Sequence, residues 1–212
     1  ADYQHDAWGV DVTVTGSQKG LMLPPGLGFN CVSRKALEAH EKSGFSKSYW
    51  DWGPMLGNNA NGFFPYTPAT NLLFGLEEAL KMLLDEEGLP HVFARHQRHA
   101  KATRIAVEHW GLEVLCQVEE EHSPVLTGVL LPDEHDADHV RNVILDKFDM
   151  SLGTGLGKIK GKVFRIGHLG HLNDLTLMGT LSGVEMGLTL AGVQIKAGGC
   201  QAAMDYLRET AD

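Results

Sequence analysis

A run of β-branched residues that leads straight into a glycine-flanked lysine most strongly constrains the fold of this chain. Residues 10–15 (Val-Asp-Val-Thr-Val-Thr) alternate with a period of two, which is typical of a β-strand. The segment Gly16-Ser-Gln-Lys-Gly20 follows without a break. Because α/β folds place ligands at the carboxyl ends of strands, Lys19 is a candidate nucleophile for a Schiff base. The alternative is an ordinary lysine in a turn.

The next elements are a second strand, a short helix and a long loop. Residues 27–32 are apolar and predict the strand, and Ser33 is placed as the N-cap of the helix that follows. Residues 42–66 are rich in Gly, Asn and aromatic side chains and predict an irregular segment. Loops of this length in compact domains are often functional.

Two long helices are expected in the middle of the chain. Thr67 and Pro68 have the order of an N-cap and a first helical residue, which predicts a helix over 67–87. A second helix over 90–109 carries a basic run, which we interpret as a solvated face. The buried stripe of the first helix is expected to be Leu72, Leu73, Leu76, Leu80 and Leu83, and the basic run is Arg95, Arg98, Lys101 and Arg104.

From residue 111 onward, short strands alternate with helices. This change predicts an α/β chain with a domain boundary near residue 87. In the final helix, Gly179, Gly183 and Gly187 recur every four residues and permit close helix packing. The expected strands are 112–116, 125–131 and 163–166, and the expected helices are 136–148 and 173–190.

Charge and cysteine usage exclude several function classes. The 18 basic and 27 acidic residues give a formal net charge of -9, which disfavours a general role on nucleic acid or an anionic membrane surface. The 3 cysteines are widely spaced and form no CxxC pair, so they suggest neither a disulfide framework nor a zinc site. We therefore expect a cytoplasmic protein without a nucleic-acid, membrane or metal partner.

Two motifs imitate sites that we do not expect here. Residues 153–157 (Gly-Thr-Gly-Leu-Gly) look like a phosphate loop but lack the GKS or GKT ending, so we interpret them as a flexible connection between strands. His135 and His139 have the spacing of half a metal site, which His168 and His171 could complete. Because nothing else in the chain indicates a metal, we expect these histidines at the surface or at helix caps.

Three segments resemble known motifs in the same order. Residues 15–27 (Thr-Gly-Ser-Gln-Lys-Gly-Leu-Met-Leu-Pro-Pro-Gly-Leu) resemble the lysine motif of class V pyridoxal-phosphate-dependent aminotransferases. Residues 62–70 and 161–170 resemble later segments of that family, with the paired long helices between them. Within the class the sequence is most similar to serine–glyoxylate aminotransferases, through residues 23–29, 48–52 and 63–68.

The resemblance implies an α/β fold that corresponds to the C-terminal half of a type I pyridoxal-phosphate transferase. Residues 1–87 would be the C-terminal part of the large cofactor-binding domain, and residues 88–212 the small C-terminal domain. The family forms homodimers with shared active sites. The helix over 67–87 and the aromatic loop before it are therefore expected to form a dimer interface.

The resemblance also assigns roles at four positions. Lys19 would hold pyridoxal 5′-phosphate as a Schiff base and move a proton between substrate and cofactor, and Gln18 would contact the cofactor phosphate. Thr67 matches a threonine that reaches the phosphate of the neighbouring subunit's cofactor, with a simple helix cap as the alternative. Arg165 would bind the substrate α-carboxylate. An internal salt bridge is the alternative, because an unpaired guanidinium in an apolar strand is costly.

The implied activity is transfer of an amino group from L-serine to glyoxylate, which gives hydroxypyruvate and glycine. One alternative is an alanine–glyoxylate or other small-amino-acid transaminase of the same class. Another is a non-catalytic fragment that only folds or dimerises. The family's aspartate at the cofactor's pyridine nitrogen is not matched by Asp6 or Asp11. The resemblance therefore implies a chain that holds only part of the site.

Overall fold

The computed structural model of the protein describes residues 1–211 and contains two compact units. The N-terminal unit comprises residues 2–88, and the C-terminal unit comprises residues 89–211. The division lies one residue beyond the position that the sequence pattern favours, which is residue 87. Within the described residues, no helix is both long enough and apolar enough to cross a lipid bilayer.

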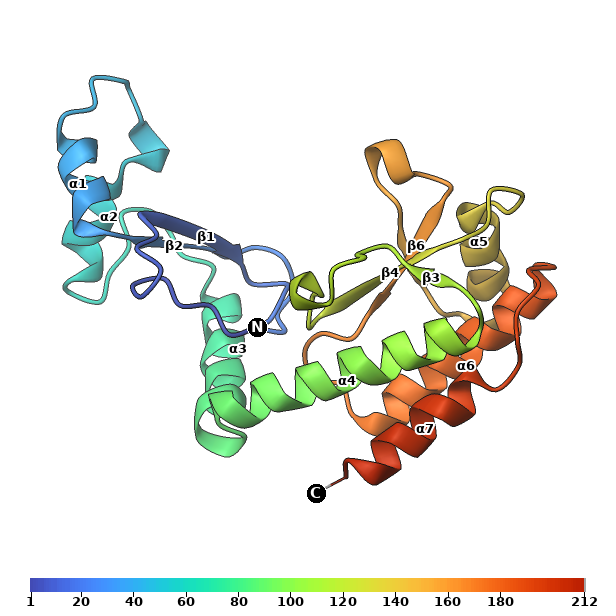
Figure 1. Ribbon diagram of the computed structural model, residues 1–212. Helices are drawn as coiled ribbons and strands as arrows, with labels where there is room; N and C mark the ends of the chain where they lie inside the picture. The colour runs from blue at the N-terminus through green and yellow to red at the C-terminus, as the bar shows by residue number, and fades with distance from the viewer. Residues whose placement is uncertain (212) are drawn as a thin grey trace. The chain divides into compact units, whose positions relative to one another are not determined.

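A two-stranded antiparallel sheet opens the N-terminal unit (Figure 1). Strand β1 (Val12–Gly16) pairs with β2 (Gly28–Val32), so that Gly16 lies opposite Gly28. Both predicted strands are confirmed to within two residues. Their long connection carries Lys19 and begins at the carboxyl end of β1, as the sequence predicts.

Short helices follow this sheet. Helix α1 (Arg34–Glu41) begins as predicted, because the Ser33 hydroxyl accepts a hydrogen bond from Ala36 N at 3.1 Å. The prediction of an irregular segment over 42–66 is wrong in part, since it contains a 3₁₀ turn, η1 (Ser48–Trp50), and helix α2 (Trp52–Asn59). Helix α2 is too short for a periodic pattern to reveal it, and the Asp51 side chain caps its N-terminus.

Helix α3 (Thr70–Leu80) begins later than predicted. Its N-cap is Ala69, which contributes no side-chain cap, and Thr70 N donates to Pro68 O in a turn before the helix. Thr67 is therefore not a helix cap. The helix continues into a π-helical segment, η2 (Lys81–Glu86). Leu83 is buried as predicted, whereas Leu80 is 37% exposed, because Ala79 takes the buried position beside it.

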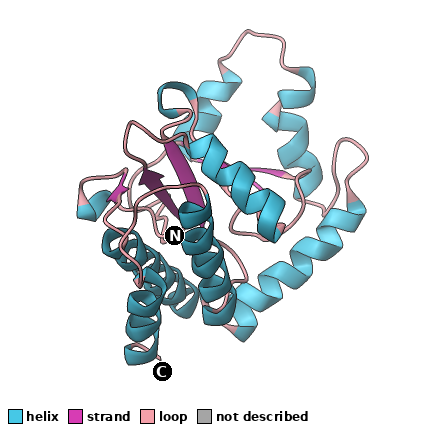
Figure 2. Cartoon of the chain, turned by 90° about the vertical axis from the view of Figure 1, so that its right-hand side faces the viewer, coloured by secondary structure: helices cyan, strands magenta, loops and turns pink. Residues whose placement is uncertain are grey.

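The C-terminal unit is built on a four-stranded antiparallel sheet with the order β3-β4-β6-β5. Figure 2 shows its strands in magenta and the surrounding helices in cyan. The strands are β3 (Glu113–Val114), β4 (Leu126–Leu130), β5 (Gly153–Thr154) and β6 (Val163–Gly167). The helices are α4 (Leu89–His109), α5 (Ala137–Phe148), α6 (Asp174–Leu190) and α7 (Gly199–Glu209), with 3₁₀ turns η3 (Glu119–Glu121) and η4 (Gly157–Ile159).

The core of this unit lies between one face of the sheet and the helices. Helices α4 and α5 contact the sheet, and α4, α6 and α7 pack on one another (Figure 1). Phe164 and Ile166 point from β6 into this core and are fully buried. Because side chains alternate along a strand, Arg165 lies on the opposite face of the sheet.

Helix α6 approaches its neighbours through two of its three regularly spaced glycines. A Cβ atom on Gly187 would lie 2.1 Å from Cγ1 of Ile144, and one on Gly183 would lie 2.7 Å from Cε of Met150. A Cβ atom on Gly179 would meet nothing within 4 Å. The prediction of close packing is thus confirmed at Gly183 and Gly187 only.

Some sequence expectations for this unit are wrong. The Gly153–Thr154 pair forms edge strand β5 rather than a flexible connection, and helix α7 was not expected at all.

Arg95 and Arg98 do not lie on a solvated face. Arg95 Nη1 donates to Gly170 O at 2.8 Å. Arg98 donates through Nη1 and Nη2 to the two Asp174 carboxylate oxygens at 2.6 and 2.8 Å. Both arginines tie helix α4 to the segment after β6.

Candidate active site

Lys19 lies in the turn that follows strand β1. Its side chain is exposed, and its carbonyl oxygen accepts a hydrogen bond from Met22 N at 3.0 Å. Met22 adopts a left-handed backbone conformation with φ of 60°, which closes the turn. Within residues 1–211 the Lys19 ammonium forms no ion pair. Its amine therefore projects from a closed turn and is available to a ligand.

Ser17 fixes the beginning of this turn. Its side chain is fully buried, and its hydroxyl donates to Pro24 O at 2.7 Å and accepts from Leu27 N at 3.2 Å. Its own amide donates to Leu27 O, and its carbonyl oxygen accepts from Leu23 N, each at 3.1 Å. Every polar group of Ser17 is thus satisfied within the loop, which anchors the backbone two residues before Lys19. Sequence reasoning missed this role, although the serine stands inside the lysine motif.

Gln18 folds its side chain back over Gly16. A Cβ atom at Gly16 would lie 2.7 Å from Oε1 of Gln18, so a larger residue at position 16 would displace the amide from this position. The Gln18 side chain is exposed, next to Lys19 on the same turn. The structure therefore brings Gln18 and Lys19 together at the end of β1, as the sequence predicts, and it supplies an amine and an amide on one small loop.

Two leucine–glycine contacts hold the lysine loop against helix α3. A Cβ atom on Gly75 of α3 would lie 2.7 Å from Cδ2 of Leu23 in the loop. A Cβ atom on Gly26 in the loop would lie 2.5 Å from Cδ1 of Leu72 on α3. Each leucine therefore fills the space that the opposite glycine leaves free. This reciprocal packing was not visible in the sequence, because it depends on which residues face one another.

Thr67 lies in the N-terminal unit, three residues before helix α3, and its side chain is exposed. A helix N-terminus would have given an independent reason for anion binding at Thr67, but the late start of α3 removes that reason. The assignment of Thr67 to a phosphate now rests on the sequence resemblance. Arg165, the remaining predicted site residue, lies in the C-terminal unit.

Arg165 lies at the middle of strand β6 between two glycines. Gly128 of β4 and Gly153 of β5 are its direct partners in the two strand pairs. Its Nε is buried and has no hydrogen-bond partner among the described residues. No Asp or Glu within residues 1–211 forms an ion pair with it. The described residues thus offer no internal salt bridge for this guanidinium, and its buried Nε is left without an acceptor.

The segment that carries Arg165 is held at both ends. Before β6, Gly161 O accepts from Ala137 N at 2.8 Å. After β6, Gly170 N donates to His96 Nε2 at 3.1 Å, and Gly170 O accepts from Arg95. These contacts fix strand β6 between helices α4 and α5.

His168 directly follows strand β6, and its side chain is fully buried. The prediction of a surface or capping histidine is therefore wrong at this position. Its Nε2 lies 2.9 Å from Thr127 Oγ1, and its Nδ1 lies 3.1 Å from Pro124 O. Burial lowers the pKa of His168 to about 4, and the hydrogen bond to Pro124 only partly opposes that effect. His168 is therefore neutral near pH 7 and is part of the support of strand β6.

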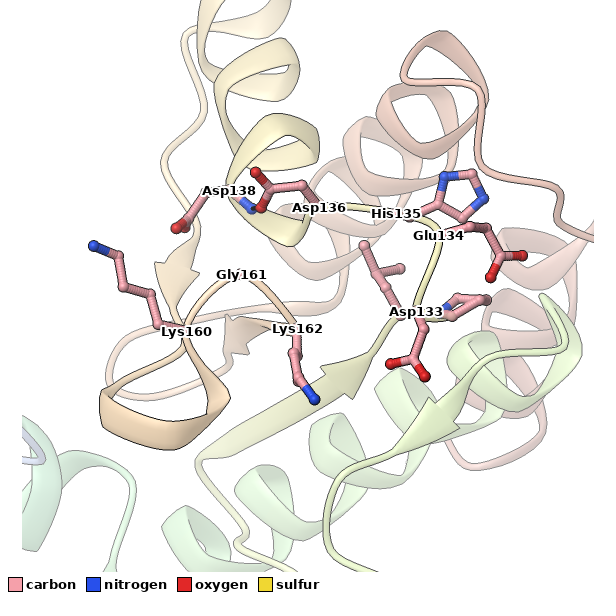
Figure 3. A pocket seen from close by; sticks show the side chains of 10 residues that line it. Asp133, Glu134, His135, Asp136, Asp138, Lys160, Gly161 and Lys162 are labelled. Carbon is pink, nitrogen blue, oxygen red and sulfur yellow. Dashed lines mark hydrogen bonds between the residues drawn. The ribbon is translucent and has the colours of Figure 1, made fainter.

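The open pocket at the N-terminus of helix α5 contains none of the predicted site residues (Figure 3). Its volume is about 570 Å³, and its labelled side chains are mostly charged. His135 lines it, but within the described residues no group of three or more His, Cys, Asp or Glu side chains is arranged to hold a metal ion. The acidic side chains that line it are Asp133, Glu134, Asp136 and Asp138, and the basic ones are Lys160 and Lys162.

Individual relatives match the chain throughout, although no family model matches it. It is 48% identical over 209 residues to serine–glyoxylate aminotransferase of Arabidopsis thaliana, which covers 98% of this chain and 52% of the plant protein. It is 43% identical to L-aspartate–glyoxylate aminotransferase of Paracoccus denitrificans, over 99% of this chain and 53% of that protein. The crystal structure of pyridoxamine–pyruvate aminotransferase from Mesorhizobium loti matches with a TM-score of 0.89 at 28% identity, over 99% of this chain and 55% of that one.

In sequence and fold, this chain matches the C-terminal half of class V pyridoxal-phosphate-dependent aminotransferases. The predicted family resemblance and fold class are confirmed, and the relatives that the chain matches are aminotransferases. The chain spans about half the length of the relatives it matches.

The residues at the end of β1 fit pyridoxal phosphate. The Lys19 amine forms no ion pair with a carboxylate of the described residues. The Gln18 amide lies over Gly16, next to Lys19 on the same turn. An exposed amine suits covalent attachment to an aldehyde, and an amide can donate to a phosphate oxygen. The side chains of this loop therefore match the chemistry of the family's cofactor.

Proposed function

We propose that this class V aminotransferase chain supplies the lysine and the substrate-carboxylate anchor of a transaminase that moves an amino group from L-serine to glyoxylate. One observation carries the proposal. The two cations that the motifs single out, Lys19 and Arg165, have no carboxylate partner within residues 1–211. Buried cations are usually paired, so the unpartnered guanidinium of Arg165 is suited to bind an anion, and the exposed Lys19 amine is open to a ligand.

The roles follow from the chemistry of each side chain. Pyridoxal phosphate, when bound, supplies the electron sink that stabilises negative charge at the substrate Cα. Lys19 would hold the cofactor covalently and would then use its Nζ to move the proton at the substrate Cα. Gln18 would donate from its side-chain amide to a phosphate oxygen. The planar guanidinium of Arg165 would hold the substrate α-carboxylate.

We further propose that the protein is a homodimer with shared active sites, in which the Thr67 hydroxyl contacts the phosphate of the cofactor bound by the partner. Large apolar side chains of the N-terminal unit support this proposal because they are strongly exposed: Phe45 by 86%, Trp50 by 78%, Phe63 by 67% and Phe74 by 71%. Exposed apolar surface on this scale is typical of interaction sites. Sedimentation analysis of the protein should give a dimer, and a strictly monomeric protein would contradict the proposal.

The substrate pair is proposed from the relatives. Serine–glyoxylate and L-aspartate–glyoxylate aminotransferases both match this chain over at least 98% of its length. Glyoxylate is common to their names, whereas the amino donor differs. Half-reactions with serine, alanine and aspartate would separate the donors, and a preference for serine is expected.

The three free cysteines, Cys31, Cys116 and Cys200, agree with the proposed reducing, cytoplasmic compartment.

Borohydride trapping tests the central assignment. The protein is mixed with pyridoxal phosphate, reduced and digested, and the labelled lysine is identified by mass spectrometry. We expect the label on Lys19, and its loss in Lys19→Arg. Lys42→Arg is the matched control, because Lys42 is also exposed in the N-terminal unit. Label on another lysine would contradict the assignment, and a protein that takes up no cofactor would favour the alternative of a non-catalytic chain that only folds or dimerises.

A further inference from the structure

Arg165 leans toward one of the two glycines that flank it. A Cβ atom on Gly153 would lie 3.1 Å from both Cβ and Nε of Arg165, and 3.4 Å from Nη2. A Cβ atom on Gly128, the partner on the other side, would instead meet Leu115 at 3.2 Å and Val163 at 3.7 Å as its nearest neighbours. The arginine side chain therefore lies along β5, over the backbone of Gly153.

Strand β5 is held in place on both sides of Gly153. Arg141 Nε donates to Leu152 O at 2.8 Å, and Thr154 Oγ1 donates to Asp138 Oδ1 at 2.8 Å. Arg141 Nη1 also donates to Asp138 Oδ1 at 2.8 Å, which links the two contacts. A two-residue edge strand is otherwise easily displaced, but here helix α5 holds it.

We propose that Gly153 is a positioning residue that determines where the Arg165 guanidinium presents itself to a substrate carboxylate. A side chain at position 153 would meet the arginine at distances shorter than ordinary van der Waals contact. Because β5 is held by Asp138 and Arg141, the flexible arginine would move instead. The inference rests on the proposed function, in which Arg165 binds the carboxylate of a small amino or 2-oxo acid. It assigns Gly153, the first residue of the segment that imitates a phosphate loop, to the support of that arginine.

The test measures carboxylate binding directly. Glyoxylate is titrated into the ¹⁵N-labelled protein while the Nε–H signals of the arginines are recorded, and Arg165→Gln identifies the Arg165 signal. We expect Gly153→Ala to shift that signal and to weaken glyoxylate binding about tenfold, since small misplacements of a binding group have large effects. Gly153→Val should weaken binding further.

Two glycine variants serve as controls. Gly128→Ala adds a methyl group on the other side of Arg165, where its nearest contacts are Leu115 and Val163, and should leave glyoxylate binding close to that of the unmodified protein. Gly179→Ala adds a methyl group that meets nothing within 4 Å and tests glycine replacement in general. Equal weakening by Gly128→Ala and Gly153→Ala would overturn the inference.

The outcomes separate this inference from the proposed function. If Arg165→Gln binds glyoxylate as well as the unmodified protein does, the proposed role of Arg165 is wrong. If Arg165→Gln abolishes binding while Gly153→Ala does not change it, only the role of Gly153 is wrong. If Gly153→Ala destabilises the protein too strongly for binding to be measured, the same change is made in an Arg165→Ala background, and the melting temperatures of the two Gly153→Ala proteins are compared. Arg165→Ala removes the contacting Nε and Nη2 atoms but keeps Cβ, so it should restore part of the lost stability, and no recovery would overturn the inference.

Discussion

The indole Nε1 of Trp110 donates a hydrogen bond to Oε2 of Glu185 at 2.7 Å, which places a carboxylate of helix α6 at the start of helix α7. The same carboxylate accepts from Gly198 N at 3.1 Å and from Cys200 N at 2.8 Å. Gly198 is the N-cap of α7 and contributes no side-chain cap. Glu185 therefore replaces the missing local cap and joins helices α6 and α7 to Trp110.

We expect Glu185→Gln to destabilise the C-terminal unit. An amide offers one acceptor oxygen in place of two and turns an N–H toward the donors of the site. Loss of a charged cap typically costs about 1–3 kcal/mol. Urea unfolding of both proteins measures the difference, with Glu108→Gln as a control at an exposed position of α4. Equal effects of the two variants would contradict this role for Glu185.

The contribution of Glu185 to the stability of the folded protein should decrease as the pH falls. Burial would raise the pKa of Glu185, but the hydrogen bonds from Trp110, Cys200 and Gly198 outweigh it and lower the pKa to about 2. The stabilising contribution is then fully present above about pH 4.5 and is lost as the pH falls toward 2. Glu185→Gln should reduce this part of the acid dependence, which chemical unfolding at several pH values would reveal.

Helix α7 shows what the sequence could not reveal. Sequence signals for a helix start are local, whereas the cap of α7 comes from Glu185, 13 residues before Gly198. The start of α3 was misplaced for the opposite reason. Thr67 and Pro68 form a good local signal, but they lie in a turn that precedes the helix.

In the candidate site, too, local sequence motifs were visible in the sequence, whereas contacts between distant residues were not. Lys19 and Arg165 could be proposed as site residues because each lies in a motif whose residues are adjacent in the sequence. The contacts of Ser17 could not be predicted, because they form only when the loop to Leu27 closes. The position of Gly153 beside Arg165 depends on the register of β5 and β6, and a two-residue strand leaves no periodic pattern.

His168 should make the C-terminal unit sensitive to mild acid. Its folded-state pKa of about 4 lies below the ordinary value of 6.5, so the unfolded chain binds the proton more tightly. The stability is then fully present above pH 6.5 and is lost as the pH falls toward 4, by an amount on the order of 3 kcal/mol. The pKa values of His96 and His99 are also lowered, chiefly by burial, and act in the same direction.

Unfolding free energies between pH 7 and pH 4 test this prediction. His168→Gln replaces the titrating ring and should flatten the pH dependence, although it lowers stability at pH 7. His139→Gln is the control, because His139 is exposed. An unchanged slope in His168→Gln would show that other groups carry the acid sensitivity.

Ser17→Ala should loosen the lysine turn. The change leaves Leu27 N and Pro24 O without the hydroxyl that joins them, and the loss of a hydrogen bond typically costs about 0.5–1.5 kcal/mol. Hydrogen exchange at residues 17–27 should accelerate, and the yield of borohydride labelling at Lys19 should fall. Ser46→Ala, at an exposed position of the same unit, should change neither quantity. Unaltered exchange in Ser17→Ala would mean that the backbone contacts alone fix the turn.

Gly75→Ala tests the packing between the lysine loop and helix α3. Alanine favours a helix over glycine by about 1 kcal/mol, so an open site would be stabilised. Here the new Cβ would lie 2.7 Å from Cδ2 of Leu23, and such overpacking typically costs about 1–3 kcal/mol. We expect a net loss of stability and weaker cofactor labelling at Lys19, because relief of the contact moves the loop that carries Leu23.

Two comparisons decide whether this contact is the cause. Gly57→Ala in helix α2 meets nothing within 4 Å and should stabilise the protein, in contrast to Gly75→Ala. In a Leu23→Ala background the contacting Cδ2 is absent, so Gly75→Ala should change sign and become stabilising. Thermal unfolding of the four proteins of this cycle measures the coupling. If Gly75→Ala is as destabilising in the Leu23→Ala background as in the unmodified protein, the two residues are not coupled, and the position of the Lys19 loop does not depend on this packing.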